Sequence, residues 1–102
     1  MIRVVVVITA KPGRREELLS AFLANAPTVR AERGCIEYAP FLDVEGFGAP
    51  QSKIGPDSCA ILETWESAEA LKAHIAAPHM AVYAAKTKDL IASRVIHVLT
   101  PV

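Results

Sequence analysis

The sequence predicts one α+β domain over residues 1–102, with strands and helices in the order β-α-β-β-α-β. Runs of β-branched residues, and of alternating apolar and polar residues, mark the strands. Apolar residues at helical spacing follow the first and third strands, while glycine and proline gather between the second and third. A chain of 102 residues is also the length of one small domain.

The first strand is predicted at Ile2–Thr9, where nearly every residue is β-branched. A strand that is apolar on both faces is usually buried on both, so we expect it at the centre of the sheet. Lys11-Pro12-Gly13 then turns the chain.

A helix is predicted from Arg14, because apolar residues recur on one stripe. They are Leu18, Phe22, Ala26 and Val29. Pro27 lacks a backbone donor, so we expect a kink or a local break there, with the helix resuming through Glu32. Gly34 stands where a C-terminal glycine cap is expected.

The second strand is predicted at Cys35–Val44, and Pro40 favours an edge position because proline cannot donate to a sheet ladder. The segment Glu45–Asp57 contains three glycines and two prolines and is long for a hairpin connection. It is a lid, an arm over a partner or a disordered loop, and the sequence leaves these alternatives open.

The third strand is predicted from Cys59 to Trp65, with Ser67 after it as the N-cap of a helix. One face of the strand carries Cys59, Ile61, Glu63 and Trp65. The helix has an apolar stripe that includes His74 and ends before Pro78. The stripe consists of Ala68, Leu71, His74 and Ile75.

A second helical segment begins at His79, and Met80, Tyr83 and Thr87 share one of its stripes. This arrangement should bring several polar groups towards one end of the sheet. The groups belong to Trp65, His74, His79 and Tyr83.

The fourth strand is predicted at Ile91–Thr100, which completes a ferredoxin-like split βαβ arrangement. Two right-handed crossovers place both helices on one face of a four-stranded antiparallel sheet. The other face is then uncovered, although the strands carry aliphatic residues on both faces. We therefore expect a homodimer in which two such sheets form a closed α+β barrel.

Composition supports an oligomer and limits its partners. Hydrophobic residues make up 52% of the chain and charged residues 22%, which is more apolar surface than one small core needs. Eleven basic and eleven acidic residues, scattered without runs, predict no binding to nucleic acid or to an anionic membrane. The longest apolar run, Val4–Ile8, is too short to span a bilayer and no secretion signal is visible, so we expect a cytoplasmic protein.

Cys35 and Cys59 are expected to be free thiols. The hairpin of the second and third strands is centred near Gln51, which places Cys35 opposite residues near Glu66 and Cys59 opposite residues near Leu42. Neither cysteine lies at a helix N-terminus or beside a histidine, so buried and unreactive thiols are expected.

Several blocks of residues carry a resemblance that covers essentially the whole chain. They are Lys11-Pro12-Gly13, Gly34-Cys35-Ile36-Glu37-Tyr38, Glu63-Thr64-Trp65, Ser67 to His74 and Pro78-His79. Together they resemble the antibiotic biosynthesis monooxygenase family of dimeric α+β barrels. The resemblance implies a quinol-monooxygenase-like protein, because some members oxidise quinols or polyphenols with O₂ using neither metal nor flavin, while others degrade haem.

The candidate catalytic residues are His74, Glu63 and Tyr83. The helical stripe directs His74 at the sheet, where its imidazole could accept a proton or orient a substrate. Glu63 alternates with aliphatic residues, so it either has a buried hydrogen-bond partner or lines a cavity. Tyr83 is a candidate proton donor.

The candidate substrate-binding residues are Trp65, His79 and Tyr38; an indole N–H at a cavity mouth, for example, could orient an aromatic substrate. All the candidates also have structural interpretations, as core, rim or helix anchor.

We expect no cofactor and no metal. His74 and His79 lack the i, i+4 spacing of ligands on one helix face, no Glu accompanies them in a recognisable pattern, and no glycine-rich phosphate loop is present.

These observations predict a monooxygenase-like enzyme that oxidises a small electron-rich aromatic, a quinol or polyphenol, with O₂. His74 would be the base, and Trp65 and Tyr83 would form the walls of the site. Two alternatives stay open: a non-catalytic dimeric barrel that binds a small apolar ligand, and a lactone-isomerase-like enzyme. An apolar pocket without convergent polar groups would favour binding over catalysis.

Overall fold

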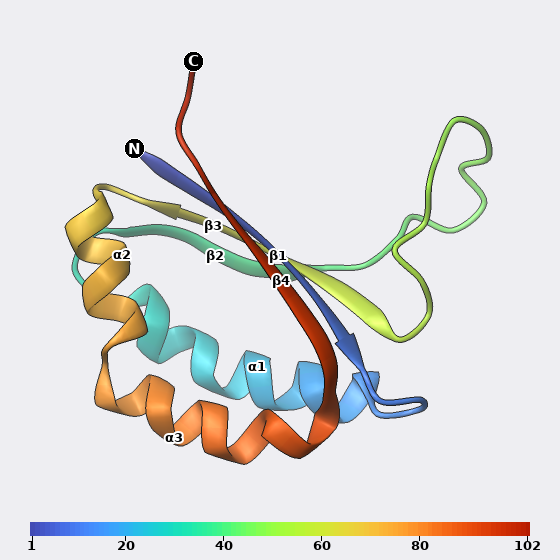
Figure 1. Cartoon of the computed structure of the whole chain (residues 1–102), viewed down its shortest axis with the longest axis horizontal. Coiled ribbons are helices and arrows are strands. Elements are labelled where there is room, and N and C mark those ends of the chain that lie inside the picture. Colours follow the sequence, from blue (N-terminus) through green and yellow to red (C-terminus); the bar gives the residue numbers. More distant parts are fainter.

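The computed structural model describes all 102 residues and has the predicted ferredoxin-like α+β fold (Figure 1). One four-stranded antiparallel sheet has the strand order β2-β3-β1-β4. The elements are β1 (Ile2–Ala10), α1 (Arg15–Arg30), β2 (Cys35–Phe41), β3 (Ser58–Trp65), α2 (Ala68–Ile75), α3 (Pro78–Thr87), the short 3₁₀ turn η1 (Lys88–Leu90) and β4 (Ile91–Leu99). None of the helices has the length and apolar character that crossing a bilayer requires.

The first strand is central, as predicted, because β1 pairs with β3 on one side and with β4 on the other. Only its helix-facing side chains are buried, which are Val4, Val6, Ile8 and Ala10. On the opposite side, Val5 and Val7 are only partly covered. Within one chain the strand is therefore buried on one face, and the expected burial of both faces is not observed.

Helix α1 buries the predicted stripe of Leu18, Phe22, Ala26 and Val29 against the sheet. The predicted break at Pro27 is not found, since the helix includes Pro27 and ends at Arg30 rather than at Glu32. Pro27 lies on the exposed side of the helix, where water can satisfy the carbonyl group that loses its donor.

Gly34 does not cap α1, contrary to the prediction, because Ala31 occupies the C-cap. Its backbone φ is +86°, and its carbonyl oxygen accepts a hydrogen bond from the backbone N–H of Glu66 at 2.8 Å. A side chain at this position would bring its Cβ within 2.6 Å of the Cβ of Ala70. Glycine is needed here for a left-handed backbone and for close packing against α2.

The segment between β2 and β3 extends away from the body of the fold, past the end of the sheet (Figure 1). Pro40 lies on an edge strand, as predicted, and β2 ends at Phe41 rather than at Val44. The carboxylate of Asp43 accepts hydrogen bonds from the backbone N–H groups of Ile54 and Gly55 at 2.9 and 3.0 Å. These bonds close the base of the loop and disfavour the disordered alternative.

The hairpin register agrees with the expected pairing of the cysteines. Cys35 lies opposite Trp65, and Phe41 lies opposite Ala60. Cys35 and Cys59 are both free thiols, as predicted, and burial raises the pKa of each.

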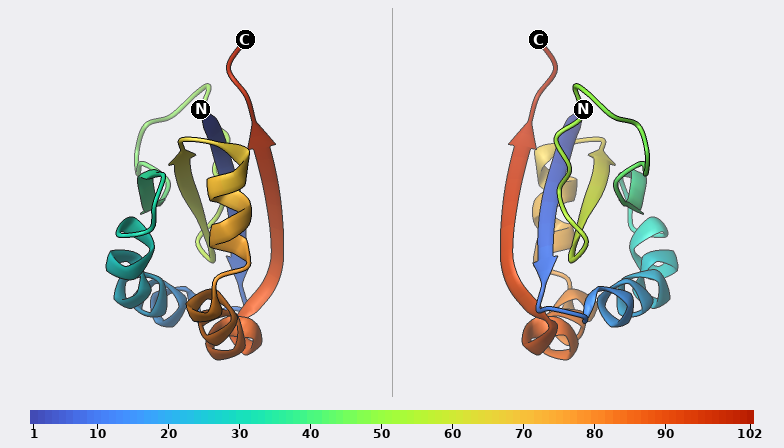
Figure 2. Two further views of the ribbon diagram at one scale, coloured as in Figure 1. Left: turned by 90° about the vertical axis from the view of Figure 1, so that its left-hand side faces the viewer. Right: turned by 90° about the vertical axis from the view of Figure 1, so that its right-hand side faces the viewer.

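All three helices gather on one side of the sheet, with β2 and β4 at its two edges (Figure 2). The uncovered face is largely aliphatic, and Phe41, Val95 and Leu99 on this face are 45%, 52% and 48% exposed. The pairing register places the following apolar residues on it: Val5, Val7, Ala39, Phe41, Ala60, Leu62, Val95 and Leu99. No helix of the chain covers these apolar residues.

Replacing Gly34 with alanine should lower the free energy of unfolding by about 2–5 kcal/mol, because the left-handed backbone and the overlap with Ala70 both disfavour a side chain. Gly46→Ala is the matched control. Its φ is +71° and nothing lies near the added Cβ, so it should cost only about 1–2 kcal/mol. Urea denaturation of both variants measures the difference, and equal losses would show that contact with Ala70 is unimportant.

Candidate active site

A cavity of about 250 Å³ lies between the sheet and the helices. Its wall is mostly aliphatic and includes side chains from every strand and helix. Among the lining residues, the ionisable ones are Tyr38, Glu63, His74, Tyr83 and Arg94. No residue of the long loop between β2 and β3 lines the cavity, so the loop does not cover the cavity as a lid.

Four of the six predicted site residues line the cavity: Tyr38, Glu63, His74 and Tyr83. Trp65 does not, although we expected it to form a wall, because it is completely buried at the end of β3. Its indole N–H donates a hydrogen bond to Oε1 of Glu63 at 2.9 Å. Trp65 therefore lies behind the wall and holds the carboxylate that faces the cavity.

His74 reaches the cavity because the helix that carries it begins at a defined residue. The hydroxyl of Ser67 accepts a hydrogen bond from the backbone N–H of Ala70, as the predicted N-cap should. From this start, helical spacing turns His74 inward, where it is only 5% exposed. The imidazole packs against Trp65 and Tyr38, with ring centroids 4.7 and 5.6 Å away.

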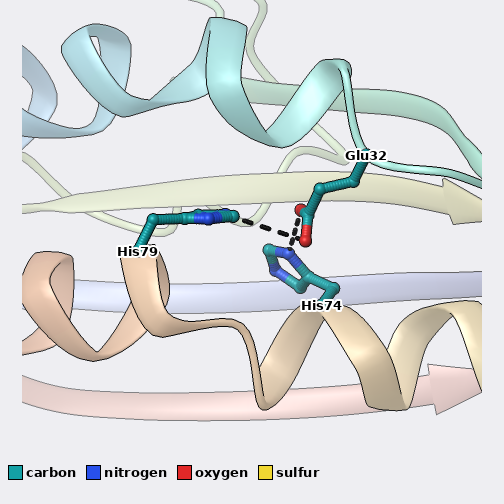
Figure 3. A group of neighbouring side chains, drawn as sticks. All are labelled: Glu32, His74 and His79. Atoms are coloured by element: carbon teal, nitrogen blue, oxygen red, sulfur yellow. Dashed lines mark hydrogen bonds and ion pairs between the residues drawn. The ribbon is translucent and has the colours of Figure 1, made fainter.

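A carboxylate fixes the orientation of the His74 ring (Figure 3). Nδ1 of His74 lies 2.6 Å from Oε2 of Glu32, which is hydrogen-bonding distance. An ionised carboxylate only accepts hydrogen bonds, so we assign the proton of the neutral ring to Nδ1. Nε2 then carries the lone pair, has no partner within the chain and is not fully enclosed. This arrangement gives His74 the geometry of an oriented general base.

Sequence reasoning missed Glu32. The sequence predicted that the helix continues through Glu32, but the helix ends at Arg30 and the chain turns back. Glu32 thereby reaches between His74 on α2 and His79 at the start of α3 (Figure 3). No spacing rule connects residue 32 with residue 74, so the sequence contains no signal for this pair.

Burial controls the protonation of the other polar groups in the cavity wall. It raises the pKa of Glu63, and the hydrogen bond from Trp65 only partly opposes this effect. It also raises the pKa of Tyr83 to about 12 and that of Tyr38 further still. Both tyrosines are therefore protonated at neutral pH and can donate hydrogen bonds to a ligand.

Comparison with known proteins identifies the family. Residues 1–86 match the family model described as "Antibiotic biosynthesis monooxygenase". The chain belongs to the antibiotic biosynthesis monooxygenase family. This membership confirms the resemblance seen in the sequence.

Relatives cover nearly the full length of the chain. It is 36% identical to the Escherichia coli protein named "Probable quinol monooxygenase YgiN" over 103 aligned residues, which are 99% of this chain and 98% of that protein. The solved structure of PA3566 from Pseudomonas aeruginosa matches 99% of this chain and 93% of its own, with a TM-score of 0.81 and 24% identity. The solved structure of Rv0793 from Mycobacterium tuberculosis matches 99% of this chain and 94% of its own, with a TM-score of 0.80 and 24% identity. The two structures show a shared fold.

Beside the cavity lies a set of side chains that could hold a metal ion. One donor atom each from Glu32, His74 and His79 lies within 4.8 Å of the others, a ligand set of two imidazoles and one carboxylate. The sequence analysis had excluded the two histidines as metal ligands on their spacing. It could not detect the carboxylate of Glu32 beside them, because Glu32 belongs to a distant part of the chain. The 2.6 Å separation of Nδ1 and Oε2 is that of a direct hydrogen bond, whereas two ligands about 2.1 Å from one ion stay further apart. His74 and Glu32 are therefore joined by a direct hydrogen bond, with His79 beside them.

His79 contacts Glu32 rather than the cavity. Its Nε2 lies 3.7 Å from Oε1 of Glu32, is enclosed and has no hydrogen-bond partner. His79 therefore borders the Glu32 carboxylate close to His74, but it does not line the cavity.

Replacing Glu63 with glutamine should stabilise the protein at neutral pH. Burial raises the pKa of Glu63 in the folded state above its unfolded value, so the wild type loses stability as pH rises through that interval. Glutamine does not ionise and can still accept the hydrogen bond from Trp65. The unfolding free energy of the variant should exceed that of the wild type by an amount that grows from pH 4 to pH 7.

Denaturant unfolding across this pH series measures the difference, and the exposed Glu37→Gln variant is the control. A difference between Glu63→Gln and wild type that stays constant with pH would contradict the assignment of a raised pKa to Glu63.

Proposed function

We propose that this protein is a monooxygenase that oxidises a small electron-rich aromatic, a quinol or polyphenol, with O₂ and without a metal or flavin. The observation that carries the proposal is the unpartnered Nε2 of His74 beside an apolar cavity, with Nδ1 held by Glu32. Family membership and the name of the Escherichia coli relative support the same class of reaction.

The proposed reaction begins when Nε2 of His74 removes a proton from a quinol hydroxyl. The resulting anion passes one electron to O₂, and the two radicals combine to form a C–O bond. The peroxide anion that results takes back the proton from His74 and becomes a hydroperoxide. The hydroperoxide then loses water, which leaves one oxygen atom in a hydroxyquinone and the other in water. The aliphatic wall excludes solvent from the radical pair and limits side reactions.

The other site residues have supporting roles in this proposal. Glu32 keeps the proton on Nδ1 and stabilises the imidazolium that forms when His74 accepts a second proton. Tyr38 and Tyr83 are neutral donors to substrate oxygens. Trp65 and His79, which we expected to bind substrate directly, would act through Glu63 and Glu32 respectively.

Oxygen consumption with a panel of quinols tests the proposal directly. The wild type should consume O₂ with at least one of them, at a rate that a chelator does not change. If no quinol supports uptake, the apolar cavity favours the alternative of a binding protein for a small apolar ligand. Uptake that a chelator abolishes would contradict a reaction without a metal.

Substituting His74→Ala should lower the rate by about 10²-fold to 10⁴-fold, the usual contribution of general acid–base catalysis. Glu32→Gln should also lower it strongly, because the amide can donate to Nδ1 and leave the proton on Nε2. If His74→Ala stays folded and keeps the wild-type rate, the base is elsewhere, and Glu63 is the next candidate.

We further propose that two copies pair through the uncovered sheet face into the dimeric barrel. A stable interface needs about 800 Å² from each partner, and the aliphatic face of four strands provides a surface of the required character. Sedimentation of the wild type at micromolar concentration should give a dimer, and Val95→Asp should give a monomer because it places a charge in that face. Val82→Asp, at a 66% exposed position on α3, is the matched control and should remain dimeric. A folded wild-type monomer would exclude the proposed pairing.

A further inference from the structure

One end of the cavity contains a cation without a partner. Arg94 lies on β4 and lines the cavity, and its side chain takes part in none of the ion pairs of the chain. Arg94 is the only lysine or arginine among the lining residues. An arginine beside an apolar surface, with all its donors free, has the chemistry to bind a planar anion.

A second free donor lies at the same end. Tyr83 lines the cavity, and its hydroxyl is neither hydrogen-bonded nor enclosed within the protein. The positive charge of Arg94 acts on this hydroxyl, although burial outweighs it and keeps the phenol protonated at neutral pH. Arg94 and Tyr83 can therefore donate hydrogen bonds to one anionic group.

The cation and the proposed base lie at opposite ends of the cavity. Across β1, Arg94 pairs with Ile8, while Glu63 pairs with Val4. Four residues of a strand span about 13 Å, which sets the scale of the distance between the two ends. His74 belongs to the Glu63 end, because both contact Trp65.

The wall between the two ends suits an aromatic ring. Ile96 and Val98 follow Arg94 on the same face of β4 and are 49% and 56% exposed, although they line the cavity. A ring lying on them would cover apolar surface that the chain leaves open. The lining residues at the other end include no lysine or arginine, so an anionic substituent finds a cationic partner only beside Arg94.

We propose that the substrate is an aromatic carboxylate whose anionic group binds Arg94 and Tyr83 while its ring hydroxyl faces His74. The oxidation of that ring rests on the proposed function, but the binding of the carboxylate does not. Arg94 would hold the carboxylate through two parallel hydrogen bonds and so set the direction in which the ring enters.

Calorimetric titration with phenylacetate and with its uncharged methyl ester tests the binding. The acid should bind the wild type at least tenfold more tightly than the ester. Arg94→Gln should weaken binding of the acid by about 10-fold to 100-fold and leave the ester unchanged, as expected for loss of a charge-assisted pair. Arg94→Lys should fall between the two, because lysine keeps the charge but not the planar fork.

Arg33→Gln is the matched control, since Arg33 is exposed, forms no ion pair and lies outside the cavity. It should bind the acid like the wild type. Equal affinity of the wild type for acid and ester, no binding of either at millimolar concentration, or an equal effect of Arg94→Gln on both would overturn the proposal.

Turnover separates this inference from the proposed function. Oxygen uptake with (2,5-dihydroxyphenyl)acetate should show a lower KM than with its methyl ester, and Arg94→Gln should remove that difference in KM. Selective binding of phenylacetate without any oxygen uptake would reject the monooxygenase function and retain the anion site. Oxygen uptake without any preference for the acid would retain the monooxygenase function and reject the anion site.

Discussion

The hydrogen bond between Glu32 and His74 connects the two crossover segments of the fold at the cavity. Glu32 follows the last turn of α1, and His74 lies on the buried side of α2, so the bond joins the two helical connections above the sheet. It also decides which nitrogen of His74 is free. If the carboxylate were absent, the buried imidazole would have no charged partner and no fixed tautomer. The position of α2 and the chemistry of the cavity therefore depend on the same contact.

Two carboxylates with different partners surround this imidazole. Glu32 pairs with His74, while Glu63 accepts its hydrogen bond from the neutral indole of Trp65. Burial raises the pKa of Glu63 and so disfavours charge on that carboxyl group. Different environments for two similar groups are a general way to give them different roles in acid–base chemistry.

The two faces of the sheet serve different purposes. The helix face contains the cavity and the cluster of Glu32, His74 and His79, whereas the opposite face carries many apolar residues among polar ones such as Thr9 and His97. The long loop projects past the end of the sheet, away from the cavity, with its base closed by Asp43. Of the three alternatives that the sequence left open for this loop, this position favours an arm over a partner, because a second copy on the uncovered face would lie beside the sheet rather than over the helices.

The sequence alone determined the order of the elements, the central position of β1, the edge position of β2 and the inward direction of His74. Each follows from a local period or from the missing donor of proline, which near neighbours in the chain encode. Only the tertiary structure decided the partner of His74, the burial of Trp65 behind Glu63 and the place of Arg94 at the cavity. Glu32 meets His74 because α1 ends at Arg30, and Arg94 faces the cavity because of its register with Ile8. Helix ends and strand registers result from the packing of the whole domain, and no pattern within a single segment specifies them.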